Sequence, residues 1–221
     1  IEDLSLPILK TVAAKGVVNE EYPYSAGIFT GAGLQDAPER SILRRADLVL
    51  GIGVRLNEIL DQSADIQNIV NFDIATKPTE TNGNVKTLCV DKGTIISLLE
   101  ELKTFEWGGS EIDYTRERLL ELASMGEFLP WSVYQALQSK LPDNTRYVVD
   151  TGNFCTVAEH FLVSRKPYEK IFSANGRYMG SSVPLGIAAS LVGARAPTVV
   201  VCGDGGIGMY ISEIKIAVDN Q

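Results

Sequence analysis

The sequence has few cysteines and only one histidine. Its three cysteines, Cys89, Cys155 and Cys202, lie far apart and form no C-x-x-C pair, and the histidine is His160. An odd number of widely spaced cysteines argues against a disulfide framework and against a zinc site, and it favours a reducing, cytoplasmic compartment. We expect three small buried thiols and a surface histidine without a catalytic partner.

The chain also lacks an excess of basic residues and a long apolar run. Lys and Arg number 20 against 28 Asp and Glu, so the net charge is −8. This balance argues against nucleic acid or an anionic membrane as the main partner, and no run approaches the ~20 apolar residues of a membrane span. A small anion still fits, because backbone N–H groups and a metal can hold one locally. The start at Ile1 lacks an initiator Met and a signal-peptide pattern, so we expect the chain to begin inside a longer one.

What remains is an ordinary globular composition, with 45% hydrophobic and 22% charged residues. Short apolar segments alternate with helical ones, which predicts two α/β units with parallel sheets covered on both faces. The predicted strands are residues 47–53, 68–73, 85–90, 146–150, 170–173 and 198–202. The predicted helices are residues 6–14, 37–46, 94–103, 129–141, 181–194 and a last one from about Met209, and residues 19–35 are predicted as a loop.

The pattern predicts three parts along the chain. Residues 1–103 form a central Rossmann-like domain, and 128–221 form a second three-layer unit that is incomplete at its C-terminal end. Between them, residues 104–127 contain Trp107-Gly108-Gly109 and a charged stretch, which is typical of a linker with one solvated helix.

The most specific feature is Gly203-Asp204-Gly205-Gly206-Ile207-Gly208, which follows a β-branched strand and matches G-x-G-x-x-G. A glycine-rich turn between a strand and a helix can also occur for steric reasons alone, without binding a ligand. In a dinucleotide site, Asp204 would face the pyrophosphate, and two like charges at ~4 Å cost ~4 kcal/mol at an effective dielectric of ~20. A divalent cation between them reverses the sign, since Mg²⁺ takes one or two carboxylates with phosphate oxygens and waters. The aspartate therefore indicates a metal-bridged diphosphate.

With these residues the sequence resembles thiamine diphosphate-dependent enzymes, in particular the group of acetohydroxyacid synthase, pyruvate oxidase and the 2-oxo acid decarboxylases. The likeness spans nearly the whole chain. In the second unit it is carried by Asp150 to Asn153 (DTGN), by 175–186 (NGRYMGSSVPLG) and by Gly203-Asp204-Gly205. In the first unit it is carried by 14–17 (AKGV), 27–33 and 46–55 (ADLVLGIGVR).

The resemblance implies roles for the glycine loops. Asp204 would bind Mg²⁺, which chelates the cofactor diphosphate, and the N–H groups of Gly205 and Gly206 would face the phosphates beside Gly203. Gly152 and Asn153 would touch the diphosphate from the other side, although Asn153 equally suits a simple turn. The family's second metal ligand, an Asn well downstream, is not found, since only 16 residues follow Gly205.

It also implies roles near the cofactor rings. Met179 matches a bulky apolar residue that wedges between the two rings and forces a V-shape, and the alternative is a core methionine. The carbonyl of Arg177 would accept from the pyrimidine amine, although the family often has Gly there, and Met209 would pack on the pyrimidine. Residues 55–58 (RLNE) depart from the Arg-Phe-Asp-Asp pattern of the flavin-binding members, so FAD is not expected.

The implied reaction is decarboxylation of a small 2-oxo acid, followed by protonation or carboligation of the enamine. The activating glutamate belongs to an N-terminal domain in this family, so no catalytic residue is assigned here, and we expect the 221 residues alone to be an inactive piece of a homodimeric or homotetrameric enzyme. Two alternatives stay open: a nucleotide- or flavin-binding module without catalysis, and an NAD-dependent dehydrogenase.

Overall fold

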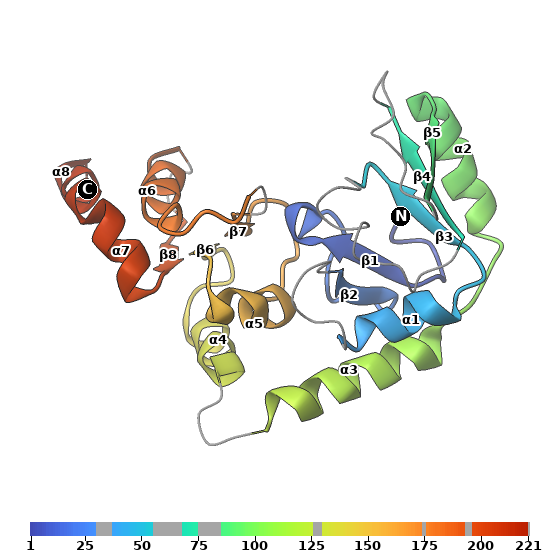
Figure 1. The fold of residues 1–221 in the computed structure, drawn as a ribbon, viewed down its shortest axis with the longest axis horizontal. Coiled ribbons are helices and arrows are strands. Elements are labelled where there is room, and N and C mark those ends of the chain that lie inside the picture. Colours follow the sequence, from blue (N-terminus) through green and yellow to red (C-terminus); the bar gives the residue numbers. More distant parts are fainter. Residues whose placement is uncertain are drawn as a thin grey trace. The chain divides into compact units, whose positions relative to one another are not determined.

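The structure, a computed structural model, describes residues 1–29, 37–54, 68–74, 85–125, 130–173, 176–192 and 196–220. Its contacts divide the chain into two compact units (Figure 1). The first comprises Ile1–Thr11 and Tyr22–Leu122, and the second comprises Val12–Glu21 and Ala123–Gln221. The predicted boundaries at 103 and 127 stay a prediction. The contacts add the segment 12–21 to the second unit and most of the expected linker to the first.

The first unit contains the predicted parallel α/β sheet. Its strands β3 (Val49–Ile52), β4 (Ile69–Asp73) and β5 (Val85–Cys89) pair in the order β3-β4-β5, all parallel. Asn71 is fully buried in the central strand and fixes the position of the chain after β3. Its side-chain oxygen accepts from the N–H of Val54 at 3.2 Å, and its side-chain nitrogen donates to the carbonyl of Val54 at 3.1 Å. Helix α2 (Lys92–Leu102) begins at Asp91, which accepts from the N–H of Thr94 at 2.9 Å.

Two predictions for the N-terminal segment are wrong. Residues 6–14 are not a helix: they form strand β1 (Ile8–Thr11) and a short 3-10 turn, η1 (Val12–Ala14). Residues 19–35 are not a continuous loop, because strand β2 (Ser25–Phe29) lies within them and pairs with β1 in parallel. All residues of β2 except Gly27 are buried, and helix α1 (Glu39–Arg45) packs on the strand. A tertiary partner thus overrides the helical pattern.

Helix α3 (Gly109–Ala123), expected as a solvated linker helix, packs on the first unit. Its Ile112 and Thr115 are buried. The guanidinium of Arg116 donates to the carbonyl of Ser25 at 3.0 Å and to that of Pro23 at 3.2 Å. The charged face of this helix therefore holds the N-terminal strands as well as facing solvent.

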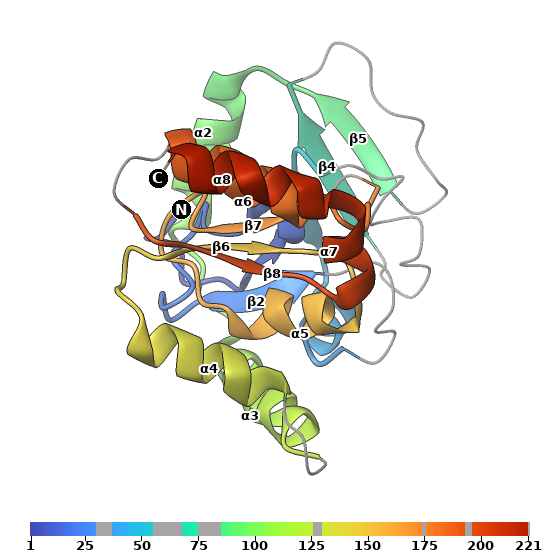
Figure 2. The same ribbon diagram turned by 90° about the vertical axis from the view of Figure 1, so that its left-hand side faces the viewer.

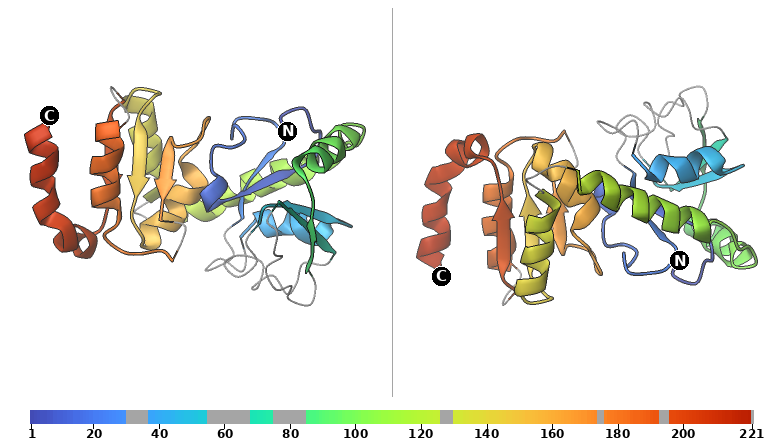
Figure 3. Two further views of the ribbon diagram at one scale, coloured as in Figure 1. Left: turned by 90° about the horizontal axis from the view of Figure 1, so that it is seen from above. Right: turned by 90° about the horizontal axis from the view of Figure 1, so that it is seen from below.

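The second unit is a three-layer sandwich. Strand β6 (Arg146–Val149) lies between β7 (Lys170–Phe172) and β8 (Thr198–Val201), and all three are parallel. Helix α6 (Ser182–Val192) covers one face, and α4 (Pro130–Lys140) and α5 (Asn153–Phe161) cover the other (Figures 2 and 3). The core between β6 and α4–α5 is formed by Tyr134, Tyr147, Val149, Cys155, Ala158 and Leu162.

Two helices of this unit differ from the prediction. Helix α5 follows β6 directly and was not expected. The last helical segment begins at Asp204 rather than near Met209, as α7 (Asp204–Tyr210), followed by η3 (Ile211–Glu213) and α8 (Ile214–Asn220). Glycines lower helix propensity, but Gly206 fits at this helix start where a side chain would not, since an added Cβ would lie 2.2 Å from Oδ2 of Asp150.

The cysteines and the histidine depart in part from expectation. All three cysteines are free, but only Cys155 is buried, while Cys202 is half-buried and Cys89 is exposed. His160 is half-buried in α5 rather than a surface residue. No helix in the described part of the chain has the length and apolar character that crossing a membrane requires.

Candidate functional site

The two glycine loops that the sequence singled out lie at one edge of the second sheet. Strands β6 and β8 are parallel neighbours with Val149 opposite Val201, and the N–H of Asp150 donates to the carbonyl of Val201 at 2.8 Å. The chain therefore leaves both strands at the same carboxyl-terminal edge, where ligands of open parallel sheets bind. This brings the turn at Gly152 beside the turn at Gly203.

One aromatic ring lies close to both turns. A Cβ added at Gly152 would lie 2.6 Å from Cε1 of Phe154, and one added at Gly203 would lie 3.7 Å from the same atom. The ring of Phe154, which the sequence did not single out, therefore lies against both loops. A side chain at position 152 would force this ring to move.

A buried carboxylate joins the third predicted segment to this edge. Asp150 is fully buried, and its Oδ2 accepts from the N–H of Gly180 at 2.7 Å. A Cβ added at Gly206 would lie 2.2 Å from that same oxygen. The segment around Gly180 and the helix start at Gly206 thus pack against one carboxylate. The sequence showed Asp150 only as the first residue of a motif, and its place after a buried strand was the available signal.

Met179 lies over the Gly-Asp-Gly loop. Its Sδ and Cε are each 3.9 Å from where a Cβ of Gly205 would be, and its side chain is 49% exposed. A core methionine would be covered on all sides, so this side chain is free to contact a ligand placed above the loop. The neighbouring Arg177 has φ +47° and Gly180 has φ +85°, both in the left-handed region.

Asp204 is the first residue of α7 and is exposed. Its Oδ1 accepts from the N–H of Gly205 at 2.9 Å. Among the described residues, no group of three or more His, Cys, Asp or Glu side chains could hold a metal. One carboxylate beside backbone N–H groups suits Mg²⁺ only when phosphate oxygens and waters complete its shell, and this donor set fits a Mg²⁺-bound diphosphate.

The other predicted residues lie on the same two helices. Asn153 is exposed as the first residue of α5, and Met209 is 55% exposed near the end of α7. The structure thus brings Gly152, Met179 and the 203–206 loop together, and the individual cofactor and metal roles stay predictions. Residues 55–58, on which the flavin argument depended, lie outside the described residues.

The thiols near this edge are not poised as nucleophiles. Burial raises the pKa of the Cys155 thiol to about 12, with a further contribution from the charge of Glu159. Burial and then the charge of Asp150 raise the pKa of Cys202. Since the thiolate is the reactive form, neither cysteine supplies a nucleophile.

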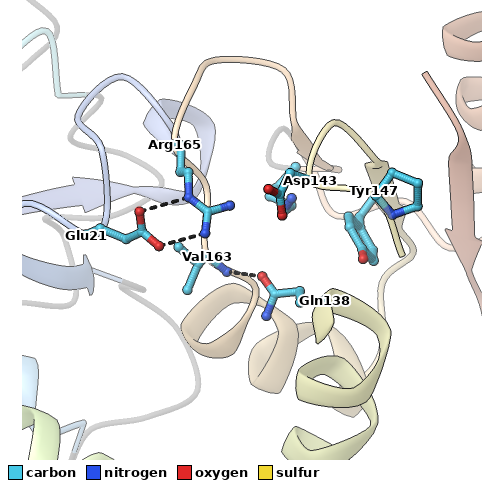
Figure 4. A pocket seen from close by; sticks show the side chains of 8 residues that line it. Glu21, Gln138, Asp143, Tyr147, Val163 and Arg165 are labelled. Carbon is cyan, nitrogen blue, oxygen red and sulfur yellow. Dashed lines mark hydrogen bonds and ion pairs between the residues drawn. The ribbon is translucent and has the colours of Figure 1, made fainter. Parts of the chain in front are cut away.

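A separate pocket of about 140 Å³ opens at the opposite edge of the sheet (Figure 4). Tyr147 and Lys170, near the starts of β6 and β7, line it. So does the bidentate pair of Arg165 and Glu21, at 2.7 and 2.8 Å. Burial lowers the pKa of Lys170 to about 8, while its ammonium lies 4.4 Å from the centre of the Tyr147 ring. None of the predicted cofactor residues lines this pocket.

Comparison with known families matches both units. Residues 1–102 match the profile of the central domain of thiamine pyrophosphate enzymes, and residues 150–221 match that of their C-terminal domain, which binds thiamine pyrophosphate (thiamine diphosphate).

Individual curated proteins are similar along the whole chain. Human 2-hydroxyacyl-CoA lyase 2 is 24% identical, with 100% of this chain and 37% of the relative covered. A probable 2-ketoarginine decarboxylase of Pseudomonas aeruginosa is 23% identical over 98% of this chain and 40% of its own length. The large subunit of acetolactate synthase isozyme 1 of Escherichia coli is 24% identical over 100% of this chain and 41% of its own length. The chain spans well under half the length of these relatives. With one family's profiles matching both units, and the glycine loops meeting at one sheet edge, the chain belongs to the thiamine pyrophosphate enzymes.

Proposed function

We propose that this chain is part of an enzyme that uses thiamine diphosphate and Mg²⁺ to decarboxylate a small 2-oxo acid, and then protonates the product or joins it to a second carbonyl compound. The observation that carries the proposal is the position of the half-exposed Met179 above Gly205, beside the exposed carboxylate of Asp204. A wedge for the cofactor rings and an anchor for a metal-bound diphosphate are thereby neighbours.

The proposed work of this chain is binding and orientation. Asp204 would hold the Mg²⁺, and the glycine backbone at 203–206 and the turn at Gly152 would lie against the diphosphate. Because Gly206 packs directly on Asp150, the loop is fixed before a ligand arrives, and preorganisation of this kind reduces the cost of binding. When bound, thiamine diphosphate supplies the carbon nucleophile and electron sink for cleavage beside a carbonyl group.

The names of the similar proteins include a decarboxylase, a lyase and a synthase, and this favours 2-oxo acid chemistry in the whole protein. We propose the small 2-oxo acid as the substrate and a homodimer or homotetramer as the assembly, without nucleic acid or membrane as partner. The net charge of −8 supports the last point.

Calorimetry with the purified chain tests the proposal. Thiamine diphosphate should bind in the presence of Mg²⁺, and Asp204→Ala should weaken this binding at least tenfold, because the diphosphate then loses its metal bridge. The matched control is Asp219→Ala, which removes an exposed carboxylate that pairs with Lys215 on α8. Equal binding by both variants would contradict the role of Asp204. Stabilisation by NAD or FAD, but not by thiamine diphosphate, would favour the dehydrogenase or the non-catalytic module.

The proposal also holds that residues 1–221 alone do not turn over a 2-oxo acid. The glutamate that the resemblance assigns to cofactor activation has no matched position here. Release of CO₂ from pyruvate by the purified chain, with Mg²⁺ and thiamine diphosphate present, would disprove this part without affecting the binding site.

A further inference from the structure

Arg177 adopts a backbone conformation that suits glycine. Its φ is +47°, and among the residues that the structure describes it is one of three non-glycine residues with positive φ. Two residues further along the chain is Met179, whose side chain lies over Gly205. A non-glycine residue stays in this region only where its surroundings hold it.

The side chain of Arg177 is held by a buried carboxylate. Glu159 on α5 is 1% exposed, and its Oε1 lies 3.1 Å from Nη1 of Arg177. Nη2 of Arg177 donates to Oε2 at 3.4 Å, and the Cys155 thiol donates to Oε1 at 3.4 Å. Arg177 brings a formal cation to this carboxylate, and a buried charge that loses such a partner is strongly unfavourable. The pair therefore fixes where Arg177 lies.

The other end of the same short segment is held as well. The N–H of Gly180 donates to Oδ2 of Asp150 at 2.7 Å. Asp150 directly follows β6, and Glu159 lies in α5, the next element of the chain. Both carboxylates that hold residues 176–180 therefore come from β6, α5 and the turn between them. Met179 lies between the two residues that these carboxylates hold.

We propose that Glu159 is a positioning residue: through its ion pair with Arg177 it holds residues 176–180 in the conformation that places Met179 over the diphosphate loop. This rests on the proposed function for the identity of the ligand. Glu159 itself touches no ligand, since it is buried behind Arg177 and acts on the part of the site that contacts the cofactor rings.

The first test compares two ligands. Removing the charge with Glu159→Gln should weaken binding of Mg²⁺–thiamine diphosphate about tenfold, because the ring-contacting segment loses its fixed position. Binding of Mg²⁺ with inorganic diphosphate should change less than twofold, because Asp204 and the 203–206 backbone are untouched. Glu39→Gln is the matched control: Glu39 is equally buried, at 1% exposure, but belongs to the first unit. Equal losses for both ligands, or no loss, would overturn the proposal.

The second test uses coupling to the backbone. Glycine adopts φ +47° without strain, so Arg177→Gly should make the segment independent of Glu159. E159Q should then cause no further loss of binding in the R177G background, where it also removes the buried charge that R177G leaves without Arg177. E159Q can be compared by stability instead of binding. If the chain unfolds when E159Q is the only substitution, but stays folded when R177G is also present, the two positions are coupled as proposed. If E159Q unfolds the chain in both backgrounds, Glu159 is a core residue and the proposal is wrong.

The third test needs no ligand. Hydrogen exchange of the Gly180 amide should become at least tenfold faster in E159Q, with the amide of Val148 in β6 unchanged. Exchange of the Gly180 amide in R177G/E159Q should be no faster than in R177G. Unchanged exchange at Gly180 would overturn the positioning role even if the chain binds thiamine diphosphate. A wild-type chain that binds no thiamine diphosphate would instead contradict the proposed function, and the exchange result would still decide the role of Glu159.

Discussion

At the scale of single residues, Asp150 organises the site without being exposed at it. One carboxylate oxygen accepts from Gly180, and the same oxygen lies where a side chain of residue 206 would start. Glycine at 206 is therefore required by close packing, in addition to any contact with a phosphate. Sequence motifs showed that these glycines matter, but the atom that requires them is visible only in the structure.

Substitution of Gly206 tests this packing. Gly206→Ala should lower the free energy of unfolding by roughly 1–3 kcal/mol, because the new methyl group meets Asp150 Oδ2, which is held by its hydrogen bond to Gly180. Gly208→Ala is the control in the same helix: nothing lies within 4 Å of its added Cβ, so it should be neutral or slightly stabilising. Urea unfolding of both variants gives the answer, and equal stability would show that the carboxylate moves aside freely.

Lys170 gives a prediction about pH. Its pKa falls to about 8 in the folded chain because burial disfavours the ammonium, against a contribution from Glu169 that raises it. The unfolded lysine holds its proton up to about pH 10.4, so between about pH 8 and 10.4 the unfolded state binds more protons and stability rises with pH. Below pH 8 the buried charge is a constant cost.

Lys170→Met should therefore raise the free energy of unfolding at pH 7 by roughly 1–3 kcal/mol, after the loss of the contact with the Tyr147 ring. The gain should shrink as the pH rises from 8 to above 10. Lys140→Met, at an exposed position at the end of α4, should show no such trend. Denaturant unfolding at several pH values measures both, and a gain that is independent of pH would mean that folding does not lower the pKa of Lys170.

At the scale of elements, the periodicity of apolar residues predicted β3 to β8 within a few residues, but it failed for β1 and β2. Strands β3 to β8 are short apolar runs of the kind that sheets covered on both faces require. Strand β1 has the spacing of a short helix, and β2 consists partly of small residues, so each is specified by its pairing with the other and by the packing of α1.

The start of α2 gives a test at this scale. Asp91 accepts from both the N–H and the hydroxyl of Thr94 at 2.9 Å, and these bonds lower the pKa of its carboxyl group. The stabilisation is present above the unfolded pKa and is lost as the pH falls through the folded pKa. Asp91→Ala should thus lower the melting temperature at pH 7 but have little effect near pH 2.

Asp113→Ala is the control for Asp91, since Asp113 is 76% exposed in mid-helix and its ion pair with Arg116 is long, at 4.0 Å. Thermal unfolding followed by circular dichroism at the two pH values separates the cap from a general charge effect. Similar shifts for both variants would mean that the cap bonds with Thr94 do not stabilise α2.

At the scale of the whole molecule, the segment 12–21 shows that the units are not simple stretches of sequence. Lys15 Nζ donates to Glu20 at 2.8 Å and to the carbonyl of Glu159 at 2.8 Å, and Glu20 accepts from the N–H of Ser164 at 2.7 Å. Gly16, at φ +86°, approaches the carbonyl of Lys166 so closely that no side chain fits. Ten residues near the start of the chain thus complete the unit that carries the glycine loops.

Removing the Lys15 charge tests this assignment. The side chains of Lys15 and Glu20 are 1% and 11% exposed, so Lys15→Met should leave a nearly buried carboxylate without this partner and destabilise the second unit by roughly 3 kcal/mol. Lys166→Met, at an exposed position beside the same segment, should be neutral. Hydrogen exchange resolved by unit is the measurement, and an effect on the first unit alone would contradict the placement of residues 12–21.

The sequence by itself determined the α/β class, most strands, and the Gly-Asp-Gly loop with its implied diphosphate and metal, because these depend on local patterns and on the sign of one charge. Only the tertiary structure decided that β1 pairs with β2, that Gly180 and Gly206 pack against Oδ2 of Asp150, and that Glu159 pairs with Arg177. Each of these joins residues 17 to 56 positions apart in the chain. Contacts of that kind depend on distance and burial in space, which no local pattern contains.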